Sequence, residues 1–492
     1  MISALILVPL FAGIAALILR NNLWRRALLL ITAIFHTGMT LSAWVVKPAP
    51  SLEGWLAFDA IGLLFLSITS LLFFFCTLYA INYLKNEPPV NHEDFEERVF
   101  FSNAPEARFT GCLLLFLATM TLVPLSQHFG ILWVSIEATT LASAPLIFFH
   151  RHHRSLEATW KYLLVCSVGI AVALLGNFSL AVAASMEKGN HISMVIGEMI
   201  KDAPHLHIPW LKAAFICFLV GYGTKMGLAP MHTWLPDAHS ESPSVVSALL
   251  SGALLNCAFV GILRAYQICS AAGIAQFSQS LLIGFGLFSM LVATVFIIGQ
   301  TDYKRLLAYS SIEHMGILSL GVGIGGSARF GAILHAINHS FTKGMLFLLA
   351  GNILSFYKTK DCGRVKGISR ILPQSGALWI AGLFAITGSP PFGSFISEFL
   401  ILKGAIESGH FIAASAYLLF LALIFIGMAT VMMPMVQGVT SEEIKNLKPG
   451  KETFLSIMPP VALGIIMVVL GIYIPSFLSH AVEQASNMLG GF

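Results

Sequence analysis

The sequence is poor in charge. Only 11% of its 492 residues are Asp, Glu, Lys or Arg, whereas 57% are hydrophobic and the mean hydropathy is +0.82. This composition excludes a soluble globular domain, in which about a quarter of the residues are charged. Apolar runs of about 20 residues recur along the chain, and each is long enough to cross a hydrocarbon core ~30 Å thick as a helix. The sequence therefore predicts an all-α polytopic membrane protein.

The cysteines lack the spacings of metal and haem motifs. The seven cysteines, at positions 76, 112, 166, 217, 257, 269 and 362, form neither CxxC nor CxxCH. This pattern argues against an iron-sulfur cluster, a c-type haem or a disulfide framework, so we expect no cofactor in this chain. A basic leader is also missing before the first apolar run, which predicts a retained span and not a cleaved signal.

The apolar runs predict about fourteen spans. Approximate ranges are 3–19, 25–46, 57–84, 109–126, 129–149, 158–185, 212–233, 244–268, 279–300, 304–323, 330–356, 376–409, 411–436 and 455–480. Most loop lysines and arginines follow odd-numbered spans. Arg264 is counted with the few basic residues on the opposite face of the membrane, which follows even-numbered spans. The positive-inside rule then places both termini on the non-cytoplasmic side of the cell inner membrane.

The spans divide into four regions. Residues 1–108 form an N-terminal three-helix segment with a polar loop, residues 109–268 and 279–436 form two blocks of five spans, and residues 437–492 hold a loop and the last helix. An odd number of spans per block gives the two blocks opposite orientations. The fourth span of each block, the seventh and twelfth overall, is interrupted by GYGTKMGLAP and TGSPPFGSF. Matching breaks in inverted halves are typical of a transport site.

Lys225 lies near the middle of the seventh span, just before Pro230. A lysine facing lipid at this depth would cost several kcal/mol, so we expect it inside the protein with a carboxylate partner. Glu137, in WVSIEATTL, is the natural partner for a direct ion pair. The pair is either a static structural contact or a switch that releases a proton when the carboxylate is drawn away.

The second block contains the densest set of titratable residues. One span carries Glu313 and His314, and the next carries His335, His339 and Lys343 at i, i+4 and i+8. This spacing aligns three groups on one helical face, and histidine suits proton relay because it titrates near neutral pH. There are two alternatives to a proton relay. His335 and His339 are either a packed pair or the ligands of a metal ion or haem. We predict that the chain has no metal site, because its sequence has no second helix with such a pair of histidines.

Four further residues have two interpretations each. Asn256 either bridges water or packs, since its amide does not titrate. Asp237, His239 and Glu241 follow Pro236 on an expected loop, where they either take up protons from the cytoplasm or form a solvated turn.

Glu398 and Lys403 follow the break in the twelfth span. Glu398 is the relay candidate, because it has the place in the second block that Lys225 has in the first. The two residues lie about 140° apart around the helix, so they face different neighbours. Lys403 either completes the exit path or extends along the helix to the membrane surface.

The motifs give the chain its resemblance to a known family. Over nearly its whole length, the chain resembles the antiporter-like subunits of respiratory complex I, Mrp-type antiporters and energy-converting hydrogenases. The motifs that carry this resemblance are WVSIEATTL, GYGTKMGLAPMHTWLPDAHSESPSVVSALLSG, TDYKRLLAYSSIEHMG, HAINHSFTKGMLFLLAGN and GSPPFGSFISEF. IEATTL, PDAHSESPS, LLNC and SSIEHMG together most resemble the F subunit of hydrogenase-4 and formate hydrogenlyase-type complexes.

This resemblance implies fourteen spans, two inverted five-helix repeats and broken helices 7 and 12. It implies an input pair of Glu137 and Lys225, a link between half-channels at His335 and His339, and a terminal proton site at Glu398. Asn256 departs from the pattern, because complex I relatives carry a lysine there. A direct proton transfer from lysine to lysine would then be replaced by transfer through water held by Asn256, or through Glu313 and His314.

The expected function is a proton-translocating, non-redox subunit of a membrane-bound [NiFe] hydrogenase. Its NiFe centre and iron-sulfur clusters are expected in partner subunits, and its other partners are membrane and peripheral subunits, lipid, and protons or sodium ions, but not nucleic acid. The alternatives are the M-type subunit of NADH-quinone oxidoreductase, an Mrp-type cation/proton antiporter subunit, and a structural anchor with vestigial charges.

Overall fold

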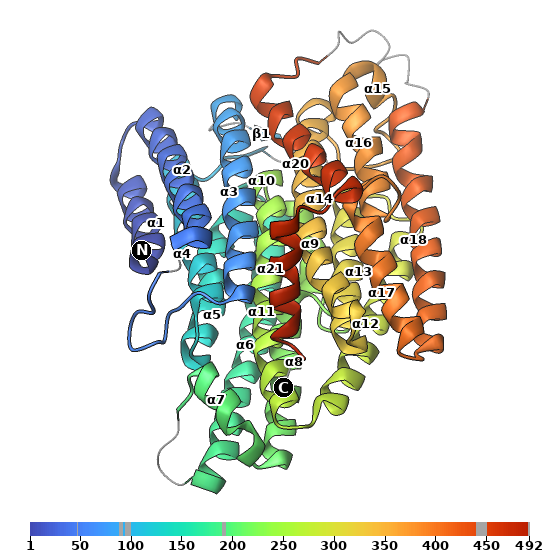
Figure 1. The fold of residues 1–492 in the computed structure, drawn as a ribbon. Helices are drawn as coiled ribbons and strands as arrows, with labels where there is room; N and C mark the ends of the chain where they lie inside the picture. Colours follow the sequence, from blue (N-terminus) through green and yellow to red (C-terminus); the bar gives the residue numbers. More distant parts are fainter. Residues whose placement is uncertain (47, 88–91, 94–99, 189–192, 439–449, 491–492) are drawn as a thin grey trace.

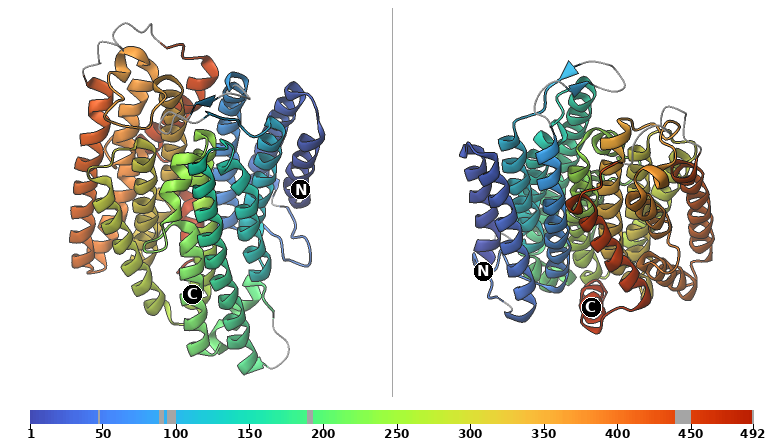
Figure 2. Two further views of the ribbon diagram at one scale, coloured as in Figure 1. Left: turned by 180° about the vertical axis from the view of Figure 1, so that it is seen from behind. Right: turned by 90° about the horizontal axis from the view of Figure 1, so that it is seen from above.

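The computed structural model describes residues 1–46, 48–87, 92–93, 100–188, 193–438 and 450–490. Almost all of its elements are helices that run side by side in one bundle (Figure 1). The chain crosses the bundle from α1 on one side to α18 on the other, and the view from above shows the same progression (Figure 2). The predicted all-α class is therefore confirmed.

The first part of the chain contains three helices, a short hairpin and three more helices. These are α1 (Ile2–Ile18), α2 (Asn22–Val46), α3 (Ala60–Asn86), β1 (His92–Glu93), β2 (Phe100–Phe101), α4 (Glu106–Leu125), α5 (Phe129–Ile147) and α6 (His153–Lys188). The two strands pair antiparallel, with position 92 opposite position 101. Most of the polar loop between α3 and α4 lies outside the described residues.

The middle of the chain supplies the centre of the bundle. Its elements are α7 (Ile196–Asp202), η1 (Ala203–His205), α8 (Ile208–Met226), α9 (Trp234–Glu241), α10 (Ser244–Leu249), the π-helical turn η2 (Leu250–Leu254), α11 (Leu255–Ala271) and α12 (Ala275–Ile297). The segment from α10 to α11 is enclosed on every side by other helices. Such enclosure favours polar side chains that would be costly against lipid.

The last part contains α13 (Tyr303–Ile324), α14 (Ser327–Tyr357), α15 (Ile368–Ile371), α16 (Pro373–Ile386), α17 (Gly393–Glu407), α18 (Phe411–Gln437), α20 (Phe454–Ile472) and α21 (Ser476–Asn487). The central helix here is α14, which packs against α13, α16, α17 and α20. The outer helices α2 and α18 expose large apolar side chains, as helices that face lipid do.

Within the described residues, nine helices are long and apolar enough to cross a membrane, and α1 and α16 are shorter apolar helices. Neither α13 nor α14 is among the nine, because their polar side chains lower the hydropathy. A count of fourteen spans and the inverted repeats stay predictions.

Both predicted breaks are present. α8 ends at Met226, Gly227 takes a left-handed conformation with φ of +84°, and the helix resumes as α9 at Trp234. The second break separates α16 from α17 and contains Gly388 with φ of +62°. Each break holds one cis proline bond, before Pro230 and before Pro391.

Arg264 falls within the predicted span 244–268, although it was counted with the basic residues of the non-cytoplasmic face. It lies inside α11, is 0% exposed, and its guanidinium donates to both carboxylate oxygens of Asp59, with 2.8 Å between Nη2 and Oδ1. Asp59 also caps the start of α3 by accepting from the amide of Gly62. The ion pair therefore joins two helices that are far apart in sequence.

Candidate functional site

Lys225 is held by hydroxyl groups, and no carboxylate of the described residues contacts it directly. Its side chain is 0% exposed, and its Nζ donates to Thr140 Oγ1 and to the Tyr162 hydroxyl, each at 2.7 Å. The ammonium also lies 4.5 Å from the centroid of the Tyr162 ring, a favourable cation–π distance. Thr140 Oγ1 in turn donates to Glu137 Oε2 at 3.2 Å. A threonine hydroxyl thus stands where a direct ion pair was expected.

Glu137 is half-buried on α5 and accepts a second hydrogen bond from Ser167 of α6, at 3.0 Å from Oε1. Both carboxylate oxygens therefore face hydroxyl donors. Thr140 follows Glu137 by three residues, so the helical spacing of IEATTL already places the two side chains on one face. Ser167 and Tyr162 come from α6, and nothing local in the sequence links them to Glu137.

Asn256 joins the centre of the bundle to α14. Its Nδ2 donates to the carbonyl of Gly252 at 3.0 Å and to Ser340 Oγ at 2.7 Å. The side chain is 2% exposed, and its Oδ1 has no hydrogen-bond partner among the described residues. Ser340 is the neighbour of His339, so Asn256 contacts the helix that carries the second set of titratable groups.

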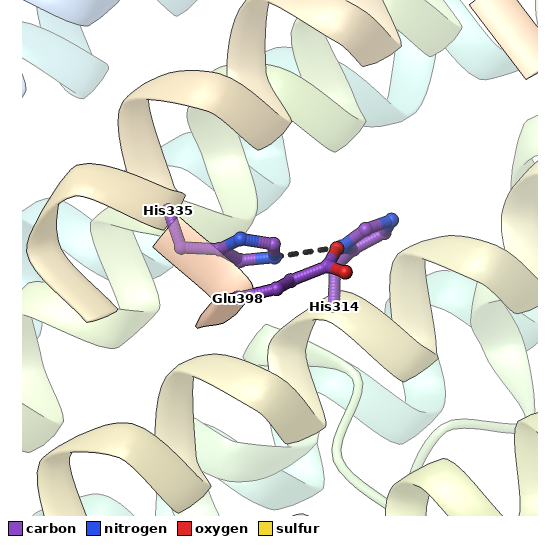
Figure 3. A group of neighbouring side chains, drawn as sticks. All are labelled: His314, His335 and Glu398. Carbon is purple, nitrogen blue, oxygen red and sulfur yellow. Dashed lines mark hydrogen bonds between the residues drawn. The ribbon is translucent and has the colours of Figure 1, made fainter. Parts of the chain in front are cut away.

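The predicted row on α14 is observed. His335, His339 and Lys343 are all 0% exposed. His335 Nε2 lies 2.8 Å from Nδ1 of His314 on α13, the contact drawn in Figure 3, and the ring of His339 lies 5.1 Å from the ring of His314. Lys343 Nζ donates to the carbonyl of Leu307 at 2.6 Å. All three side chains therefore face α13.

Glu398 reaches the same place from α17. One oxygen of Glu398 and one ring nitrogen each of His314 and His335 lie within 4.8 Å of one another. Figure 3 shows the carboxylate beside the contact between the two rings. Glu398 is 6% exposed, and its Oε1 has no hydrogen-bond partner among the described residues. These three residues offer two imidazoles and one carboxylate, a donor set that transition-metal ions accept.

The second break closes over this carboxylate. A Cβ built on Gly388 would lie 1.8 Å from Glu398 Oε2, so only glycine leaves room for the side chain as placed. Glycine also adopts the positive φ of this position at little cost. The break therefore fixes the position of Glu398.

Glu313 is the second buried acid of this region. It is 1% exposed, and its Oε2 has no hydrogen-bond partner among the described residues. Lys343 and Glu398 both lie within electrostatic range of it. An acid between a base and another acid is a suitable intermediate position for a proton.

The predicted loop after Pro236 is a helix, α9, so that prediction is wrong. Its three candidates face different neighbours. Asp237 accepts from Lys161 at 3.0 Å and from Arg305. His239 is 0% exposed and stacks on Phe347 of α14, with 5.0 Å between the ring centroids.

Glu241 lies at the edge of a polar cavity of about 410 Å³. It accepts from Lys360 Nζ at 2.7 Å and is 3.7 Å from His152 Nε2. Lys304 lines the same cavity, is 1% exposed, and donates to the carbonyl of Ser242 at 2.6 Å. Sequence reasoning missed Lys304, because it is the first residue of the predicted span 304–323 and was grouped with the loop lysines that follow odd-numbered spans.

Lys403 is not part of the buried set. Half of its side chain is exposed, and its Nζ lies 3.6 Å from Glu407 one turn further along α17. The exposed position and this contact favour the interpretation of Lys403 as a surface lysine, and its role as an exit group stays a prediction.

The fold and the site together define a class. The chain is a multi-pass helical membrane protein with acids and bases buried at its centre, on two interrupted helices and the helices between them. The sequence matches the family described as "NADH:quinone oxidoreductase/Mrp antiporter, TM" over residues 126–427, and the chain belongs to this family of antiporter-like membrane subunits.

Similar proteins come from several kinds of complex. A hydrogenase-4 component F homolog of Methylacidiphilum infernorum is 35% identical over 88% of each chain. Subunit N of the NADH-quinone oxidoreductase of Desulforudis audaxviator is 26% identical over 72% of each chain. A chain of the Mrp complex from Dietzia sp. has the same fold, with a TM-score of 0.84 over 99% of this chain and 97% of that chain, at 18% identity.

Proposed function

We propose that this chain is the proton-translocating, non-redox subunit of a membrane-bound [NiFe] hydrogenase of the hydrogenase-4 or formate hydrogenlyase type. The observation that carries the proposal is the set of fully buried Lys225, His339, His335 and Lys343 together with the buried acids Glu313 and Glu398. Buried ionisable groups inside a membrane protein are expensive, and they mark ion and proton paths.

The first half of the route consists of Glu137, Thr140 and Lys225. A hydroxyl can accept a hydrogen bond from the ammonium and donate one to the carboxylate, as Thr140 does. When Glu137 is drawn away or protonated, the charged form of Lys225 loses stabilisation in its low-dielectric site, and a proton leaves. Charge movement in a partner subunit thereby drives proton release.

The second half leads from His339 through His314 and His335 to Glu398. Asn256 and Ser340 lie where the two halves meet. Asn256 Oδ1 has no hydrogen-bond partner among the described residues, and water held beside it passes the proton onward. The cavity lined by Glu241 and Lys304 supplies protons from the cytoplasm. His239 is buried, lies within electrostatic range of Lys304 and His339, and passes these protons inward. The two halves are residues 109–268 and 279–436, inverted relative to each other, in a chain with fourteen spans.

The hydrogenase assignment is supported by the 35% identity to the component F homolog over 88% of both chains. In this assignment the NiFe centre and the iron-sulfur clusters lie in partner subunits. Both termini face the non-cytoplasmic side of the inner membrane.

Two other assignments use the same fold. In a quinone-linked complex, the subunits that co-purify with the chain are quinone-reductase subunits instead of hydrogenase subunits. In an Mrp-type antiporter, the purified complex exchanges sodium ions for protons without an electron donor.

The test compares two lysines that both lie within helices. Lys225→Met removes the buried charge, and the matched control Lys403→Met removes an exposed one. In proteoliposomes of the assembled complex, we expect redox-linked proton translocation to be lost in Lys225→Met and kept in Lys403→Met, with electron transfer retained in both. Full translocation by Lys225→Met would overturn the proposal.

A further inference from the structure

The cluster of His314, His335 and Glu398 has the geometry of a metal site in addition to that of a proton relay. The three donor atoms lie within 4.8 Å of one another, and all three residues are buried. Their helices are α13, α14 and α17, which pack against one another. The site is therefore formed by the tertiary fold and not by a motif in one helix.

The ring of His335 is already oriented as a metal ligand is. Its Nδ1 lies 2.9 Å from Ser397 Oγ, and its Nε2 points at His314 (Figure 3). Histidines that bind metals usually form such a hydrogen bond through their second nitrogen, which fixes the ring and the tautomer. Ser397 in turn accepts from Asn338 at 3.1 Å, so the supporting group is itself held in place.

The distances require only a small opening. The two imidazole nitrogens now lie 2.8 Å apart and share a hydrogen. Around a tetrahedral zinc ion with bonds of about 2.0 to 2.1 Å, two ligand nitrogens are about 3.3 Å apart. When a metal ion takes the place of the shared hydrogen, that hydrogen moves to Nε2 of His314, so both imidazoles stay neutral. The rings then separate by about half an ångström.

The local charge also fits a divalent cation. Two neutral imidazoles and the Glu398 carboxylate leave one positive charge on a bound dication. Glu313 lies within electrostatic range of Glu398 and balances that charge. Glu398 Oε1 and Glu313 Oε2 both lack hydrogen-bond partners among the described residues, so both have lone pairs to offer.

We propose that His314, His335 and Glu398 bind a divalent transition-metal ion of the zinc class. Two nitrogens and one oxygen suit zinc, whereas sodium and calcium prefer oxygen ligands only. Because the ion occupies both ring nitrogens and the carboxylate, it blocks transfer of protons among them. This consequence for transport rests on the proposed function, but binding itself does not.

The binding experiment uses the assembled complex, stripped with a chelator and equilibrated with zinc chloride. Bound zinc is counted by mass spectrometry in the wild type, His335→Gln, Glu398→Gln and the control His339→Gln. His339 lies one turn from His335 but contributes no donor atom to the group. We expect one zinc fewer per complex, or an affinity at least tenfold lower, in His335→Gln and Glu398→Gln only.

Cobalt(II) provides a second readout, because tetrahedral cobalt absorbs in the visible range. The same two variants should lose this absorption, and Glu398→Gln keeps the test valid if His335→Gln does not assemble. Wild-type zinc content and cobalt spectrum in both variants, or loss of zinc in His339→Gln, would overturn the site.

The transport experiment is separate. In wild-type proteoliposomes, we expect zinc to lower redox-linked proton translocation and a chelator to restore it. Zinc that binds at the cluster and leaves translocation undiminished would overturn the blocking role. Loss of translocation in Glu398→Gln with unchanged zinc binding would overturn the metal site and leave the proposed function standing.

Discussion

Lys225 and Glu137 are joined through one hydroxyl group. Thr140 Oγ1 accepts from the ammonium at 2.7 Å and donates to the carboxylate at 3.2 Å. A carboxylate in direct contact would hold the lysine charge tightly, whereas a hydroxyl with a rotatable hydrogen couples the two groups and still lets each change its charge. The contact therefore suits a switch better than a static ion pair.

Thr140→Val tests this bridge. Valine has the shape of threonine without the hydroxyl, so Lys225 loses one of its two hydroxyl partners. A hydrogen bond to a charged group contributes about 1.5 to 3 kcal/mol, and about 1.4 kcal/mol corresponds to a factor of ten. We expect redox-linked translocation in proteoliposomes to slow by about tenfold or more.

The control for this variant is Thr140→Ser, which keeps the hydroxyl. It should retain most of the activity. Equal translocation by the valine and serine variants would show that the hydroxyl does not connect Lys225 to Glu137.

Gly388→Ala tests the contact between the second break and Glu398. A Cβ at this position would lie 1.8 Å from Glu398 Oε2, so the carboxylate must move. Gly409→Ala is the matched control, since Gly409 also has a positive φ, of +75°, but no atom of the described residues beyond its chain neighbours lies within 4 Å of its Cβ position. Each alanine should cost about 1 to 2 kcal/mol of stability from the backbone conformation alone.

We expect only Gly388→Ala to lower translocation. The measurement compares the initial rate of proton uptake into proteoliposomes with the thermal stability of the same preparations. A similar loss of translocation in both variants would indicate a general effect of strain and no special role for the contact.

The breaks and several buried residues could be predicted from the sequence because their signals are local. Glycine and proline mark both interruptions, and the i, i+4, i+8 spacing puts His335, His339 and Lys343 on one face without any knowledge of the tertiary structure. Lys225 and Glu398 stand out because a charge in an apolar run is costly at any orientation except inward.

The partners of these residues could not be predicted, because they come from other helices. Tyr162 and Ser167 reach the site from α6, and Ser and Tyr are common in apolar helices, so neither stood out. α9 was missed for a different reason. Pro236 suggested a loop, but it occupies the first turn of α9, where a proline removes no helical hydrogen bond.

Arg264→Met tests the buried ion pair with Asp59. Removal of one partner from a buried pair typically costs about 3 to 5 kcal/mol, because the remaining charge is left without compensation. We expect a lower midpoint of thermal unfolding for the detergent-solubilised protein. Asp59→Asn combined with Arg264→Met should recover part of the loss, since asparagine still caps α3 and carries no charge.

The control for this prediction is Arg364→Met. Arg364 is 75% exposed and forms a surface pair with Asp361, at 3.6 Å. Such pairs contribute about 0 to 1 kcal/mol, so the midpoint should hardly change. If Arg264→Met were as stable as Arg364→Met, the buried pair would not support the fold.

One measurement tests most directly whether the two halves form one route. Redox-linked proton translocation is measured in proteoliposomes of the assembled complex with Lys225→Met, with Glu398→Gln and with both changes together. If the two halves form one route, a block at either end stops the whole route. We therefore expect the double variant to have the same translocation rate as the single variant with the lower rate. Partial losses that add up in the double variant would mean two independent routes, and full translocation in the double variant would mean that these buried charges move no protons.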